Sequence, residues 1–99
     1  MRIFFKRTGG FAGSQLEGSL DTSSLPASQV RQLKQLLKQS CFFELPPVLG
    51  SGQPESDRFS YKVTVEAEGA IHTVEAGEAA IPVSMRPFLD FLTRSLRHK

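Results

Sequence analysis

The chain contains few side chains of the types that catalyse reactions or bind metals. Its histidines, His72 and His98, lie far apart, and Cys41 is its one cysteine. Neither of the usual zinc-ligand spacings, His-x-x-x-His or Cys-x-x-Cys, is present. Cys41 and His72 have the chemistry of a nucleophile and its base, but nothing in the sequence brings them together. We therefore expect no metal, no other cofactor and no enzyme activity, with Cys41–His72 catalysis kept as an alternative. We expect His72 to point outward from a strand, without a ligand role.

A glycine-rich stretch near the N-terminus has the composition of a phosphate-binding loop but not its context. Residues Gly9–Gly13 contain three glycines around Phe11. A phosphate-binding loop leads from a strand into the N-terminus of a helix. Here residues 15–21 alternate as a second strand does. We interpret the stretch as a hairpin tip, with Phe11 either folded onto the core or exposed to a partner.

The positive charges do not form a polybasic tract. Lys plus Arg number 12 and Asp plus Glu number 10, giving a net charge of +2. The basic residues of the two expected helices are Arg31, Lys34, Lys38, Arg86, Arg94 and Arg97. We interpret them as solvated helix faces and expect no nucleic-acid partner, although weak RNA binding through these residues remains an alternative.

The segment Phe42–Leu49 carries more apolar side chains than a short connection buries. It reads Phe-Phe-Glu-Leu-Pro-Pro-Val-Leu and lies between the first expected helix and the third expected strand. Prolines lower the ordering cost of binding, because they restrict the free chain. Surplus apolar groups on a stiffened loop indicate a protein-recognition element.

The remaining periodicities predict a small α+β domain. Alternation indicates strands at residues 2–7, 15–21, 58–66 and 71–76. A helix runs from Pro26 to about Gln39, and Pro87 falls in the first turn of a final helix. The order ββαββα predicts a four-stranded antiparallel sheet with two helices on one face.

Length and composition bound the function. A chain of 99 residues supports a single domain, residues 1–99, and no second core. No apolar run is long enough for a membrane span, and the N-terminus lacks the apolar core of a signal peptide. We therefore expect a cytoplasmic monomer without a membrane partner, and a lone cysteine fits a reducing compartment.

Several segments, in order, resemble a known family. They are Arg7–Gly13, Leu20–Thr22, Phe42–Pro46, Asp57–Tyr61 and Met85–Leu89. Together they are similar to the emfourin family, small bacterial protein inhibitors of thermolysin-like metalloproteases such as protealysin. The resemblance spans nearly the whole chain. Gly18 departs from it, because the family pattern favours an apolar residue at that position.

The resemblance implies a non-enzymatic inhibitor that occupies the active-site cleft of a thermolysin-like protease. Phe42, Phe43 or Leu45 would fill an apolar pocket beside the catalytic zinc. Glu44 would direct its carboxylate toward the zinc or an arginine of the cleft. Pro46 would resist the extended conformation needed for cleavage, and Phe11 would grip the cleft rim as a second element. A non-catalytic adaptor domain with a non-protease partner is the alternative.

Overall fold

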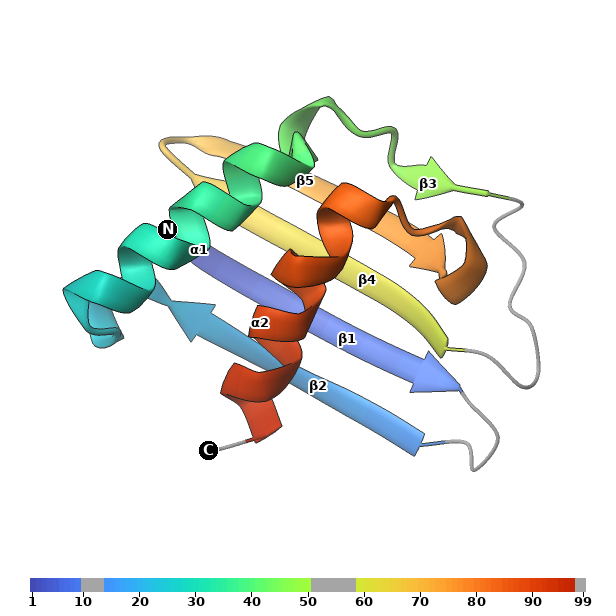
Figure 1. The fold of residues 1–99 in the computed structure, drawn as a ribbon, viewed down its shortest axis with the longest axis horizontal. Coiled ribbons are helices and arrows are strands. Elements are labelled where there is room, and N and C mark those ends of the chain that lie inside the picture. Colours follow the sequence, from blue (N-terminus) through green and yellow to red (C-terminus); the bar gives the residue numbers. More distant parts are fainter. Residues whose placement is uncertain (10–13, 51–58, 98–99) are drawn as a thin grey trace.

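The structure is a computed structural model that describes residues 1–9, 14–50 and 59–97. In this part of the chain, two helices lie across one face of a single sheet (Figure 1). The strands are β1 (Arg2–Gly9), β2 (Ser14–Asp21), β3 (Val48–Leu49), β4 (Phe59–Ala67) and β5 (Ala70–Gly77). The helices are α1 (Ala27–Ser40) and α2 (Arg86–Arg97). Short 3-10 helices are η1 (Thr22–Ser24), η2 (Phe42–Glu44), η3 (Glu78–Ala80) and η4 (Val83–Met85).

The sheet is mixed and, within the described residues, has five strands in the spatial order β2-β1-β4-β5-β3. Neighbours pair antiparallel except β3, which runs parallel to β5. The prediction of a four-stranded antiparallel sheet in the order ββαββα is therefore wrong, and the described order is ββαβββα. A two-residue strand has no alternation from which it could be predicted. The α+β class, with two helices and a sheet, is confirmed.

The core lies between the helices and one face of the sheet. Every second residue of the longer strands points toward the helices, because strand side chains alternate between faces. The side chains that are at most 2% exposed include Ile3, Phe5, Val63, Val65 and Val74 from the sheet and Leu33, Phe88 and Leu92 from the helices. The apolar stripes predicted for both helices are therefore the faces that pack on the sheet.

α1 begins at Ala27, one residue after the predicted start at Pro26. Asp21 caps η1 rather than α1: its carboxylate accepts hydrogen bonds from the Ser23 N–H at 3.0 Å and the Ser23 hydroxyl at 2.8 Å. These bonds hold the pKa of Asp21 below its ordinary value, since they favour the charged form. Pro26 directly precedes α1 and provides no side-chain cap. The polar residues before the helix thus form a separate turn.

The other face of the sheet is mainly polar. Lys6 lies 3.8 Å from Glu17, and the hydroxyls of Thr64 and Thr73 are 2.8 Å apart. Phe4 is 41% exposed on this face. Exposed ion pairs of this kind contribute little stability, so the fold depends on the helix-covered face.

β5 overturns the orientation expected for His72. The buried residues of β5 are Val74 and Ala76, and His72 has the same parity along the strand. His72 therefore points to the helix side of the sheet, where it is half-buried.

Candidate functional site

The Phe42–Pro46 segment follows directly from the end of α1. Cys41 adopts the left-handed conformation, with φ 52° and ψ 42°, and its N–H donates to the Lys38 carbonyl at 3.1 Å. A left-handed residue at this position ends a helix and redirects the chain. The Glu44 N–H then donates to the Cys41 carbonyl at 2.9 Å, closing η2. The segment begins as a compact turn, not as an extended loop.

Phe42 anchors the segment in the core. It is 1% exposed, and its ring meets that of Phe88 edge-on, with centroids 5.9 Å apart. Truncating a buried phenylalanine costs about 3–5 kcal/mol of stability. Phe42 was expected among the residues that contact a protease, but its burial leaves it no surface for a direct contact here. Its role in the segment is that of an anchor.

The rest of the segment presents an apolar group beside a carboxylate. Phe43 is 43% exposed, and its ring packs edge-on against Phe42 at 5.7 Å. Glu44 and Pro46 are exposed, whereas Leu45 is partly buried against the core. Phe43, Glu44 and Pro46 are therefore the predicted contact residues with accessible surface.

His72 contacts the segment and was missed by sequence reasoning. Its Nε2 lies 2.7 Å from the Leu45 carbonyl oxygen. Its ring centroid lies 5.5 Å from that of Phe42 and 6.1 Å from that of Phe43. The shared parity of His72 with the apolar residues of β5 was the available signal, since it places the ring on the helix side.

Phe11, the other predicted contact, lies outside the described residues. The strand ends beside it are described: Gly9 pairs with Ser14 on one side and with Phe59 on the other. His72 lies toward the opposite ends of the strands, and the Phe42–Pro46 segment adjoins the β5–β3 edge rather than the β2 edge. The described strand ends at Gly9 and Ser14, here called the Gly9 corner, therefore lie across the sheet from the Phe42–Pro46 segment (Figure 1).

Arg7, Phe59 and Tyr61 pack together at the Gly9 corner. The Arg7 guanidinium lies 4.4 Å from the centre of the Phe59 ring, and the Phe59 and Tyr61 centroids are 6.4 Å apart. Burial raises the pKa of Tyr61 above its ordinary value, against the opposing effect of the Arg7 charge. These contacts stabilise the strand ends.

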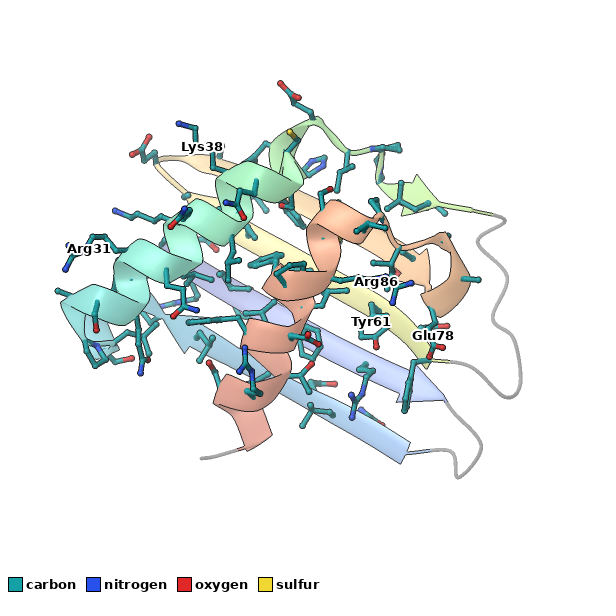
Figure 2. The ribbon with its side chains drawn as sticks, in the orientation of Figure 1. Arg31, Lys38, Tyr61, Glu78 and Arg86 are labelled. Carbon is teal, nitrogen blue, oxygen red and sulfur yellow. The ribbon has the colours of Figure 1, made fainter. Side chains whose placement is uncertain are left out.

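The catalytic and RNA-binding alternatives gain no support from the arrangement. Cys41 is exposed, and no hydrogen bond joins it to His72 in the described part of the chain. The same residues contain no group of three or more His, Cys, Asp or Glu suited to a metal. Figure 2 shows Arg31 and Lys38 pointing outward from α1, whereas Arg86 lies apart at the start of α2. Arg86 therefore lies on a different helix from Arg31 and Lys38.

Comparisons with known proteins identify a family. The model of the Emfourin family matches residues 5–93, which is most of the chain and includes the Phe42–Pro46 segment. Comparisons with curated proteins and with solved structures gave no match. Among the described helices, none is long and apolar enough to cross a membrane.

Proposed function

The chain belongs to the emfourin family, and we propose that it inhibits a thermolysin-like zinc metalloprotease by blocking the active-site cleft. Family membership supports a protease-inhibitor role in general. The thermolysin-like target, the cleft-blocking mode and the contact residues form the proposal. We also propose a cytoplasmic monomer that binds no nucleic acid.

The observation that carries the contact surface is the exposure of Phe43 on an anchored turn. Phe43 is 43% exposed although it adjoins the buried Phe42. An aromatic group held in this way binds without much further loss of conformational freedom, which favours affinity. Residues that dominate interfaces are often aromatic side chains that fill a pocket. Phe43 would enter the apolar pocket beside the catalytic zinc.

Glu44 supplies the complementary polar group. It follows Phe43 directly and is exposed. A carboxylate is a ligand for zinc and a bidentate acceptor for arginine. Glu44 would therefore bind either the catalytic zinc or an arginine of the cleft, while Phe43 occupies the pocket. Leu45 would add apolar contact from its partly exposed side.

The shape of the segment also opposes its own cleavage. Residues Phe42–Glu44 form a 3-10 turn, whereas a protease substrate must become extended at the scissile bond. Unwinding the turn would withdraw the buried Phe42 from the core. Pro46 and Pro47 further restrict the chain. The segment would therefore occupy the cleft without becoming a substrate.

Titration of a thermolysin-type protease with the purified chain tests the proposal. We expect stoichiometric loss of protease activity. Phe43→Ser or Glu44→Ala should raise the inhibition constant about tenfold or more, because truncating a central contact typically costs over 1 kcal/mol. Phe4→Ser is the matched control, since Phe4 is 41% exposed on the open face of the sheet.

The titration also separates the alternatives. Unchanged protease activity at excess inhibitor would reject the proposal and favour the adaptor reading, with a non-protease partner. If Phe43→Ser and Glu44→Ala both inhibit as strongly as the unmodified protein, this contact surface is rejected, whereas the inhibitor function is kept. Recovery of the protein only from the culture medium, not the cell lysate, would reject the cytoplasmic location.

A further inference from the structure

His72 lies where β5 meets the Phe42–Pro46 segment. Resting on the proposed function, we propose that His72 is a positioning residue of the inhibitor, which fixes the turn that presents Phe43 and Glu44.

Pro47 ends the main-chain ladder. β3 pairs with β5 in parallel, and the Glu75 N–H donates to the Pro47 carbonyl at 2.8 Å. In a parallel ladder, the next pair of bonds would join Thr73 to residues 45 and 47. Pro47 has no N–H, so it cannot donate to the Thr73 carbonyl. The Phe42–Pro46 segment thus lies beyond the last strand pairing.

His72 holds the Leu45 carbonyl where the ladder has stopped. Its Nε2 is 2.7 Å from that oxygen. A carbonyl oxygen only accepts hydrogen bonds, so Nε2 carries the proton and donates it. The bond crosses from β5 to the segment and spans 27 positions of sequence. It ties the end of the η2 turn to the rigid sheet.

The His72 ring fixes two further residues of the segment. It meets the Phe42 ring nearly perpendicularly, at 86°, and lies at 37° to the Phe43 ring. Aromatic pairs at such separations are attractive beyond their burial. His72 therefore contacts Phe42, Phe43 and Leu45, so the intervening Glu44 is carried on a turn fixed on both sides.

Substitutions at His72 separate the contribution of its hydrogen bond from the contribution of its ring contacts. Gln places its amide nitrogen near the position of the histidine Nε2, whereas the shorter Asn does not reach it. Phe keeps a ring and removes the donor. Thr73→Val is the matched control, because it removes a 2.8 Å hydrogen bond of the same strand on the opposite face. The readouts are the inhibition constant, hydrogen exchange at the Glu44 and Leu45 amides, and cleavage of the segment by the protease.

We expect His72→Asn and His72→Phe to raise the inhibition constant about tenfold, the equivalent of one lost hydrogen bond. Both variants should show faster hydrogen exchange at the Glu44 and Leu45 amides and cleavage of the Phe42–Pro46 segment by the protease. His72→Gln should stay within about threefold of the unmodified protein. Thr73→Val should leave inhibition and the exchange of the segment unchanged.

Two results would overturn the inference. One is equal loss of inhibition in the Gln and Asn variants, because the donor would then be irrelevant. The other is faster exchange without weaker inhibition. If His72→Phe does not fold, the Gln–Asn comparison decides alone. Phe43→Ser distinguishes the two proposals. If Phe43→Ser weakens inhibition and His72→Asn leaves it unchanged, positioning by His72 is rejected and the contact surface is kept.

Discussion

Tyr61 is the only tyrosine of a chain without tryptophan, so ultraviolet absorbance follows its ionisation directly. Burial raises its pKa above the ordinary value of 10.0, and the Arg7 charge opposes the shift. We expect a midpoint above 10.0 in the folded protein and a lower one in denaturant. Because the folded pKa is raised, the stability linked to Tyr61 is complete below pH 10.0 and is lost as pH rises through the folded pKa. A folded midpoint below that in denaturant would contradict the assignment, and Arg7→Ala should raise the midpoint further.

Cys41 is a residue whose backbone conformation suits glycine better than cysteine. Its φ of 52° lies in the left-handed region, which costs residues with a Cβ about 1–2 kcal/mol. Part of that cost is offset because glycine loses more backbone entropy on folding. We expect Cys41→Gly to raise the free energy of unfolding by about 0.5–1 kcal/mol in urea denaturation. Cys41→Val should lower it, because β-branched residues tolerate this region poorly.

A third substitution at Cys41 tests the catalytic alternative. Cys41→Ser keeps the size of the side chain and removes the thiol. Undiminished activity in this variant, whatever assay defines the function, would exclude a nucleophilic thiol. A destabilised Cys41→Gly variant would instead show that the thiol makes a packing contribution larger than the backbone strain it relieves.

At the scale of elements, Gly18 allows the C-terminal part of α2 to pack on β2. A Cβ at Gly18 would lie 2.7 Å from a terminal carbon of Leu96. Leu96 thus places an apolar group over the strand where Gly18 has no side chain. We expect Gly18→Val to cost about 1 kcal/mol, the low end for overpacking, because the Leu96 side chain is flexible and partly exposed and can move aside. Urea denaturation measures this cost, and Ser60→Val on the open face of β4 is a β-branched control.

A double-mutant cycle tests whether the cost of Gly18→Val arises from its contact with Leu96. Leu96→Ala removes the atoms that a valine at position 18 would meet. The two substitutions together should be less destabilising than the sum of their separate effects, by about 0.5–1 kcal/mol. Additive effects would mean that the cost of Gly18→Val comes from the strand backbone, not from its contact with α2.

The elements that the sequence predicted are the long ones with a clear period. Alternation located β1, β2, β4 and β5, and the apolar stripes located α1 and α2 to within a few residues. β3 and η2 are too short to have a period, and their positions depend on tertiary contacts. β3 exists because the chain returns beside β5, and η2 exists because Phe42 is drawn into the core.

The candidate site was predictable in composition but not in geometry. An excess of apolar residues between α1 and β4 indicated that some would be exposed, and Phe43 and Val48 are. Which of two adjacent phenylalanines is buried depends on the direction of the turn after Cys41, and sequence spacing does not specify it. The contact of His72 with Leu45 joins residues 27 positions apart, so it was visible only in three dimensions.

At the scale of the whole molecule, the sheet separates two corners that sequence reasoning had combined. The Phe42–Pro46 segment adjoins the β5–β3 edge, and the β1–β2 strand ends at Gly9 and Ser14 lie at the opposite corner (Figure 1). A standard inhibitor interface covers about 800 Å² on each partner. One compact corner can supply much of that area, so the proposal does not require both corners to enter the cleft.

Separate tests of the two corners follow from this separation. Phe43→Ser should weaken inhibition about tenfold or more with little effect on the melting temperature, because Phe43 is exposed.

Arg7→Ala should lower the melting temperature with little effect on inhibition, since it removes the stacking of Arg7 on Phe59. A lost cation–π contact of about 0.5–1 kcal/mol lowers the melting temperature of a domain this size by about 2–8 °C. The inhibition constant of Arg7→Ala should stay within about twofold of the unmodified protein.

The double variant Arg7→Ala, Phe43→Ser should show additive effects on inhibition, because no contact in the described part of the chain joins the two sites. A larger rise in the inhibition constant for Arg7→Ala than for Phe43→Ser would mean that the protease contacts the Gly9 corner instead of the Phe42–Pro46 segment. Strong non-additivity would instead show that the protease binds both corners as one surface.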